Sequence, residues 1–333
     1  MRRYHPLMTA QLQDPFVIIC PGQGAQSVSM GRAWFDASPE AKAVFQRADA
    51  LIGDRLGPSL SDLCFHGPAD RLNRTDISQP AIFVASIASW RGMLARLGTT
   101  EADAQLQATA GLSLGEYTAL HVAGAISFED ALELVTLRGR AMQDAAEAPS
   151  ATSGGGGGMV ALVGADEAQA QAVCDSARGP DVLVCANFNA PGQVVLSGHK
   201  SACERAAAVA GDMGLKSAIL PVAGAFHSSL MAPAAKRLEA ALAKTSFKAP
   251  RCPVYSNVTA QPHAPTADAS LADSIRRRLV EQLTSPVRWS QSCAAMAKAC
   301  PGSYQELAPG KVLAGLMRRI DKSVKVISND IPA

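Results

Sequence analysis

The pattern of apolar and polar positions along the chain predicts strands and helices in alternation. A short apolar run at 16–20 follows one proline and opens into a Pro-Gly loop, which is typical of a buried strand. A capping box at Ser127 to Asp130 predicts that a helix begins at about residue 128. In the first half of the chain we expect strands at 16–20 and 107–110, and helices at 81–97, 116–123 and 128–147.

A glycine-rich stretch at 150–158 interrupts this pattern, and we interpret it as a flexible linker or loop. No Gly-Lys-Ser/Thr follows, so it is not a phosphate-binding loop. The next segment has the order β-α-β-β-α-β, which is the order of a ferredoxin-like module. Its expected strands are 159–164, 182–187, 193–197 and 216–222, and its expected helices are 166–177 and 200–213.

The alternation of helices and strands resumes after this module and favours a layered α/β domain. Because the module is small and α/β patterns flank it, we interpret it as an insertion. We expect helices at 228–244, at 270–283 and from 311, and strands near 254–256 and 303–307. The expected parts are a disordered extension at 1–15, a large domain made of 16–150 and 223–333, and a subdomain at 151–222.

Composition narrows the class of protein. The 333 residues include 48% hydrophobic and 18% charged side chains, which is too apolar for a chain that is disordered throughout. A net charge of +2 and 5% aromatic residues argue against binding of nucleic acid. No uncharged apolar stretch is long enough for a membrane span.

The eight cysteines are scattered, and none forms a Cys-x-x-Cys pair or a Cys/His cluster with metal spacing. We therefore expect no metal. Scattered thiols are typical of a reducing compartment, and the N-terminus lacks the apolar run of a secretory signal. A cytoplasmic protein is the expectation that follows.

The segment Gly111-Leu112-Ser113-Leu114-Gly115 fits the Gly-x-Ser-x-Gly pattern of a nucleophile on a strand-to-helix turn. Its glycines permit a sharp turn that exposes the hydroxyl of Ser113. The backbone N–H of Leu114 then lies at a helix N-terminus and points toward a developing oxyanion. The pattern also arises by chance, but its place between an expected strand and an expected helix favours the catalytic interpretation.

A serine nucleophile needs a base, and position disfavours five of the six histidines. His121 lies on the same expected helix, about 12 Å of helical rise beyond Ser113. His227 lies between an expected strand and a helix that Ser228 opens, where a loop can reach the end of a neighbouring strand. Elimination favours His227 as the base over the alternative of a histidine that packs at a helix start. Of the others, His5 lies in the terminal tail and His66 lies in a Gly-Pro loop. His199 ends a strand of the module, and His263 lies between two prolines.

Arg138 lies on a face of the expected helix at 128–147 that is otherwise apolar. A guanidinium among apolar neighbours needs an anion, because an unpaired buried charge is unfavourable. Our hypothesis is that Arg138 binds a substrate carboxylate through two donors. The alternatives are an ion pair with an internal carboxylate such as Glu116, and a surface arginine whose charged end reaches solvent.

The loop after the first strand offers a further ligand contact. Ligands of α/β sheets bind at the carboxyl ends of strands, and Gly22 and Gly24 let the backbone of Gln23 approach a ligand closely. The N–H of Gln23 is therefore a candidate for a second oxyanion donor. The alternative is an ordinary Gly-Gln-Gly turn without a ligand.

Together these motifs resemble the malonyl-CoA:acyl carrier protein transacylase family of bacterial type II fatty acid synthesis. The resemblance extends from about residue 16 to 327 and rests on six motifs in order. They are Pro21-Gly22-Gln23-Gly24-Ala25-Gln26, Gly111-Leu112-Ser113-Leu114-Gly115-Glu116-Tyr117, Leu137-Arg138-Gly139 through Met142-Gln143, Phe226-His227-Ser228 through Met231, Asn257-Val258-Thr259, and Gln282-Leu283 before Pro286-Val287.

The resemblance implies an α/β-hydrolase-like large domain with an inserted ferredoxin-like small domain, in agreement with the pattern above. It implies that Ser113 is acylated, that His227 is its base and that Arg138 pairs with the malonyl carboxylate. It also implies that the backbone amides of Gln23 and Leu114 form the oxyanion hole.

Other positions follow from the same resemblance. Gln282 is similar to the family's active-site glutamine, which helps to position the serine and the histidine, while a backbone carbonyl orients the histidine. Phe226 resembles a malonyl-selecting residue that crowds an α-methyl group, and Asn257 is a candidate substrate-binding residue. Leu112 departs from the histidine that most members carry; because this position is not the base, we expect activity to be retained.

The implied reaction moves a malonyl group from malonyl-CoA to the phosphopantetheine thiol of acyl carrier protein, through a malonyl-serine ester. Both are substrates, so the resemblance implies no cofactor, and we expect a monomer. Open alternatives with the same chemistry are an acyltransferase of polyketide synthesis and the malonyl-transferring subunit of a malonate decarboxylase. Arg138 argues against a plain serine hydrolase, and intact Ser113 and His227 argue against a carrier-protein-binding scaffold. The basic run Arg276-Arg277-Arg278 is either a docking site for the carrier protein or, as we favour, a solvated helix face.

Overall fold

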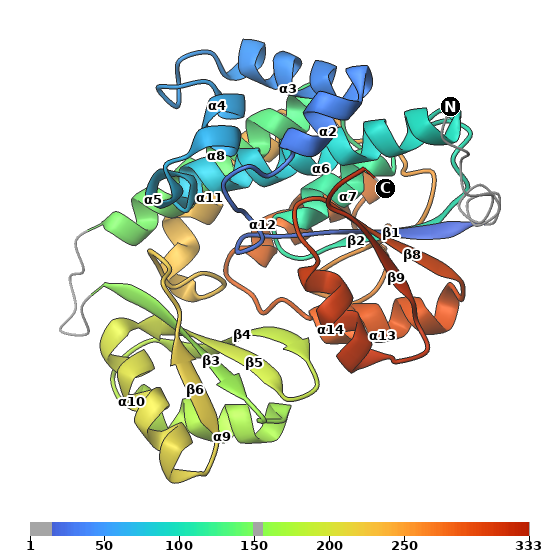
Figure 1. Cartoon of the computed structure of the whole chain (residues 1–333). Coiled ribbons are helices and arrows are strands. Elements are labelled where there is room, and N and C mark those ends of the chain that lie inside the picture. Colours follow the sequence, from blue (N-terminus) through green and yellow to red (C-terminus); the bar gives the residue numbers. More distant parts are fainter. Residues whose placement is uncertain (1–14, 149–155, 333) are drawn as a thin grey trace.

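The computed structural model describes residues 15–148 and 156–332, which form a mixed α/β protein with two sheets (Figure 1). Apart from Pro15, the expected N-terminal extension lies outside the described residues, as does the first part of the glycine-rich stretch. None of the helices within the described residues combines the length and the apolar character that a membrane span requires.

The larger sheet has five parallel strands in the order β7-β2-β1-β8-β9. Side chains of the central strand β1 alternate between two cores: Ile18 and Cys20 join one, and Val17 and Ile19 join the other. A strand buried on both faces is apolar throughout, which is why its sequence was predictive. The strands are β1 (Phe16–Cys20), β2 (Leu106–Gly111), β7 (Val254–Tyr255), β8 (Ser303–Leu307) and β9 (Val326–Asn329).

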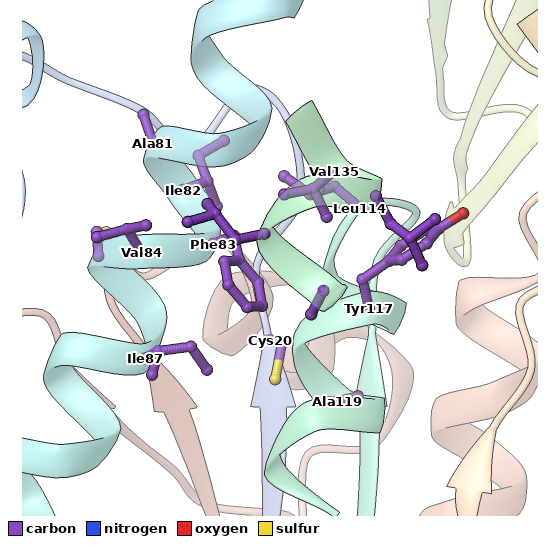
Figure 2. Close-up of a cluster of buried hydrophobic side chains, with 14 of the residues drawn as sticks. Cys20, Ala81, Ile82, Phe83, Val84, Ile87, Leu114, Tyr117, Ala119 and Val135 are labelled. Atoms are coloured by element: carbon purple, nitrogen blue, oxygen red, sulfur yellow. The ribbon is translucent and has the colours of Figure 1, made fainter. Parts of the chain in front are cut away.

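Helices cover both faces of this sheet (Figure 1). On one face, Phe83 of α6, Leu114 and Tyr117 pack in a buried cluster with Cys20 of β1 (Figure 2). On the other face, α13 and α14 supply a second core that includes Trp289. The helices outside the module are α2 (Arg32–Ala37), α3 (Pro39–Ile52), α4 (Leu60–His66), α5 (Ala69–Leu72), α6 (Thr75–Leu97), α7 (Gly115–Val122), α8 (Phe128–Glu147), the short 3-10 helix η1 (Ser229–Met231), α11 (Ala232–Leu242), α12 (Leu271–Gln282), α13 (Trp289–Ala299) and α14 (Val312–Ile320).

The smaller sheet is antiparallel, with the order β4-β5-β3-β6. Two helices cover one face and bury Val160 and Leu196, while Met159 and Val195 on the other face join the core of the larger part. Backbone hydrogen bonds between β4 and Val287 add a second connection. The elements are β3 (Gly157–Val163), α9 (Glu167–Arg178), β4 (Leu183–Ala190), β5 (Gln193–His199), α10 (Lys200–Asp212) and β6 (Lys216–Ile219).

The structure corrects the interpretation of the described end of the glycine-rich stretch. Gly157 and Gly158 are not part of a linker but begin β3, where they pair with β5. A Cβ on Gly157 would lie 2.5 Å from the backbone nitrogen of Ala225, so glycine is needed here because two backbones approach closely.

Other elements also differ from expectation, two of them for clear physical reasons. Helix α6 begins at Thr75 and contains Pro80, whereas the sequence placed its start after the proline. Most of α6 is buried, so tertiary packing outweighs the backbone hydrogen bond that Pro80 lacks. The last strand is β9 rather than β8, because this short edge strand carries too weak an apolar pattern to be recognised.

Candidate active site

The Gly-x-Ser-x-Gly motif forms the turn between β2 and α7, at the carboxyl edge of the parallel sheet. Ser113 has a φ of 53°, in the left-handed region that strains a residue with a β-carbon. Close packing requires both glycines. A Cβ on Gly111 would lie 1.9 Å from the carbonyl oxygen of Gly115, and a Cβ on Gly115 would lie 2.2 Å from the carbonyl oxygen of Cys20. The packing of α7 against the end of β1 therefore holds the serine on a tight turn.

His227 is hydrogen-bonded to this serine, with 2.9 Å between its Nε2 and the Oγ of Ser113. Its Nδ1 donates to the backbone oxygen of Gln282 at 2.7 Å, so the ring proton lies on Nδ1 and Nε2 is free to accept. Burial and the nearby charge of Arg138 lower the pKa of His227 to about 4, although the bond to Gln282 opposes this shift. The imidazole is therefore neutral near pH 7 and can accept the serine proton.

Arg138 contacts the same serine and is 1% exposed, which excludes the alternative of a side chain that reaches solvent. Its Nη2 donates to Ser113 Oγ at 3.0 Å and to Gln282 Oε1 at 2.9 Å, and its Nη1 donates to Gln79 Oε1 at 2.8 Å. All three acceptors are neutral groups. Within the described chain no carboxylate forms an ion pair with Arg138, and its Nε is buried without a hydrogen-bond partner.

The alternative partner, Glu116, accepts its hydrogen bonds from other groups. Burial lowers the pKa of Arg138, because the interior disfavours its charge. A buried cation beside the nucleophile, held by neutral acceptors, can bind an anionic part of a substrate.

Asn257 and Gln282 hold the turn from its buried side. The Oδ1 of Asn257 accepts from the backbone N–H of Ser113 at 2.6 Å, and its Nδ2 donates to the oxygen of Gly111 at 2.7 Å. Gln282, at the end of α12, donates to the backbone oxygen of Ser113 at 3.0 Å. Asn257 is fully buried, and both polar atoms of its side chain are hydrogen-bonded to the turn, while its role as a substrate-binding residue stays a prediction.

A cleft of about 540 Å³ opens in front of Ser113 and His227, between the larger and the smaller sheet. Gln23, Leu112 and Phe226 also line it, together with residues of the smaller sheet. The backbone N–H groups of Gln23 and Leu114 donate to no acceptor among the described residues. Both groups are therefore available to an oxyanion, although only Gln23 is part of the cleft wall.

Sequence reasoning missed two polar residues that contact this site. Gln79, within the apolar helix α6, accepts from Arg138. His263, which we disfavoured because it lies between prolines, donates from Nε2 to Glu116 at 2.8 Å. A polar side chain in a buried apolar helix is a signal for the first, whereas nothing local points to the second.

The basic run on α12 is engaged in local contacts. Arg276, Arg277 and Arg278 lie 2.7, 3.4 and 2.6 Å from the carboxylates of Asp273, Asp268 and Glu281. Such pairs do not distinguish a docking site from a solvated helix face, so the interpretation of the run stays a prediction. In the part of the chain that the structure describes, no group of three His, Cys, Asp or Glu residues is arranged to hold a metal ion.

Comparison with known proteins agrees with this geometry. The acyl transferase domain family matches residues 17–330. The malonyl CoA-acyl carrier protein transacylase of Salmonella typhimurium is 40% identical over 319 residues, which are 96% of each chain. The solved structure of the transacylase from Xanthomonas oryzae is 39% identical with a TM-score of 0.84, over 95% of both chains. A malonyl-transacylase in complex with a type II PKS acyl-carrier protein is 35% identical with a TM-score of 0.85, over 96% of this chain and 97% of the other. The chain therefore belongs to the malonyl-CoA:acyl carrier protein transacylase family.

Proposed function

We propose that the protein transfers the malonyl group of malonyl-CoA to the phosphopantetheine thiol of acyl carrier protein, for fatty acid synthesis. The observation that carries this proposal is the buried guanidinium of Arg138, 3.0 Å from the Oγ of a serine that is hydrogen-bonded to a neutral histidine. A simple hydrolase needs the serine and the histidine but has no use for a cation there. A carboxylate on the transferred acyl group explains why Arg138 lies beside Ser113 and His227.

In the first half of the proposed cycle, Ser113 Oγ attacks the thioester carbon while His227 Nε2 takes the hydroxyl proton. The developing oxyanion accepts hydrogen bonds from the N–H groups of Gln23 and Leu114. The carbon–sulfur bond then breaks, and the CoA sulfur leaves with the proton that His227 returns. A malonyl ester on Ser113 remains.

In the second half, the phosphopantetheine thiol gives its proton to His227, and its sulfur attacks the ester carbon. The ester carbon–oxygen bond breaks, and Ser113 regains its proton from His227. Every proton moves between substrate and side chain, so the cycle needs no cofactor. Because the backbone oxygen of Gln282 fixes the histidine ring, a carboxylate as third member is not required.

Selectivity in this proposal has two sources. Arg138 exchanges its bond to Ser113 for two bonds to the malonyl carboxylate, which also aligns the acyl group with the nucleophile. Phe226, next to the base, lines the cleft, and its ring restricts the space for an α-methyl group. Discrimination against one methyl group is typically about 1–3 kcal/mol.

We also propose the finer classification of the fold. The parallel sheet with its nucleophile turn supports an α/β-hydrolase-like domain made of 16–150 and 223–333. The β-α-β-β-α-β order and the strand order β4-β5-β3-β6 support a ferredoxin-like subdomain at 151–222. A polyketide carrier protein is a second candidate partner, because a relative forms a complex with one.

The mass of the intact protein after mixing with malonyl-CoA tests the proposal. We expect a malonyl adduct that disappears when holo acyl carrier protein is added, and no adduct with Ser113→Ala. Parallel reactions with acetyl-CoA and methylmalonyl-CoA test Arg138 and Phe226. Rapid release of free malonate without transfer would instead indicate a hydrolase, and the absence of any reaction would support the scaffold alternative.

A further inference from the structure

The carboxylate of Glu116 binds three donors in the interior behind Ser113. Its Oε2 accepts from Gln282 Nε2 at 2.6 Å and from the backbone N–H of Asn257 at 3.0 Å. Its Oε1 accepts from His263 Nε2 at 2.8 Å, and the side chains of Glu116 and His263 are both fully buried. The proposed cycle uses neither residue, yet Asn257 and Gln282 are the two side chains that hold the Ser113 turn.

His263 also fixes the backbone that carries Asn257. The backbone N–H of His263 donates to the backbone oxygen of Val254 at 2.8 Å. This bond closes the loop that follows β7. Within this loop Ala260 has a φ of 56°, a strained conformation that persists only where surrounding contacts determine it. His263 therefore acts on Asn257 in two ways, through the closed loop and through Glu116.

The hydrogen-bond pattern indicates the form of the ring. The Nδ1 of His263 is buried and has no partner among the described residues. A neutral ring with its proton on Nε2 buries no unpaired donor, whereas an imidazolium would bury one. Gln282 connects the carboxylate of Glu116 to Arg138, because it accepts from the guanidinium and donates to the carboxylate.

We propose that His263 is a positioning residue for acyl transfer: together with Glu116 it orients Gln282 and Asn257, and through them Ser113 and His227. This inference rests on the proposed function, since it assigns His263 to the same site. None of His263, Glu116, Asn257 and Gln282 lines the cleft, so their effect falls on the reactivity of the serine rather than on contacts with CoA. A ring that only filled space would have no such effect on rate.

Three variants of the full chain separate these possibilities. His263→Gln places an amide donor close to the position of Nε2, whereas His263→Asn places it near Nδ1, too short to reach Glu116. His263→Ala removes the donor altogether. Two rates are measured for each: acylation by malonyl-CoA in a single turnover, and labelling of Ser113 by a fluorophosphonate, which contains no carboxylate for Arg138.

We expect both rates to fall about tenfold or more in the Asn and Ala variants, with KM for malonyl-CoA changed less than about twofold. The Gln variant is expected to keep most of both rates. Equal rates for Gln and Asn variants of similar melting temperature would overturn the proposal, as would a change confined to KM. If the wild-type protein takes up no malonyl group, the proposed function fails, and the fluorophosphonate rates still decide the role of His263.

Discussion

Replacement of Arg138 by methionine removes the charge from the site and puts an apolar side chain of similar length in its place. In the structure, Arg138 is 1% exposed, and its Nη2 donates to both Ser113 and Gln282. A malonyl carboxylate that binds here forms charged hydrogen bonds in a site shielded from water. The methionine variant cannot form them, so an acyl group with a carboxylate loses much more than one without.

The expected magnitude follows from the number of these bonds. A hydrogen bond to a charged group contributes about 1.5–3 kcal/mol, so two such bonds contribute at least about 3 kcal/mol. This corresponds to a loss of roughly 150-fold in kcat/KM for malonyl-CoA. Acetyl-CoA has no carboxylate, so its kcat/KM changes only through the lost contacts of Arg138 with Ser113, Gln79 and Gln282 and through its lost charge near His227, which affect both substrates.

The assay compares transfer of malonyl and acetyl groups to holo acyl carrier protein by wild type, Arg138→Met and Arg138→Lys. The ratio of the two kcat/KM values is an internal control, because general damage to the fold lowers both. Arg138→Lys keeps the charge but loses the paired donors, and we expect an intermediate ratio. An unchanged ratio in Arg138→Met would refute the reasoning and make the arginine a structural residue.

Two pH predictions follow from buried groups. Because burial first, and Arg138 second, lower the pKa of His227 from 6.5 to about 4, the base stays neutral down to about pH 5. The single-turnover acylation rate is therefore expected to stay level from pH 8 to 5 and to fall near pH 4; an inflection near 6.5 would contradict this. Burial raises the pKa of Glu306 to about 7, although hydrogen bonds from the backbone N–H groups of Leu313 and Ala314 oppose this shift. The protonated side chain therefore contributes its full stability below pH 4.5, and this contribution is lost as the pH rises through 7. In urea titrations, the wild type should lose about 3 kcal/mol more unfolding free energy than Glu306→Gln between pH 4.5 and 8. The same pH dependence of the unfolding free energy in both proteins would contradict this prediction.

The predictability of the elements depended on how completely each is buried. Strand β1 is buried on both faces and helix α8 has one apolar face, so their patterns were clear. Helices α2, α4 and α5 have four to seven residues each, which is too short for a helical period to stand out. Strand β9 is at the sheet edge and buries only Asn329, so its sequence lacks the apolar run of a central strand.

Some residues of the site could be recognised from local sequence motifs, whereas others meet only in the folded chain. Ser113 and His227, which the structure places in hydrogen-bond contact, could be predicted because a nucleophile and a base each demand a residue type in a particular kind of turn. Glu116 and His263 are separated by 147 positions, and their contact depends on how α7 packs against the loop after β7. No local pattern contains that information, so the buried side of the site became visible only in the fold.

Leu112 shows why one departure from the family pattern is compatible with this site. Its backbone forms the turn: the N–H donates to the oxygen of Cys20 at 3.1 Å, and its carbonyl accepts from Gly115 at 3.0 Å. Its side chain contributes only apolar surface to the cleft wall. Since no hydrogen bond of Ser113, His227 or Arg138 involves position 112 among the described residues, a leucine there leaves their geometry intact. The turn depends on the glycines at 111 and 115, where any β-carbon would overlap the backbone, and not on the side chain that precedes the serine.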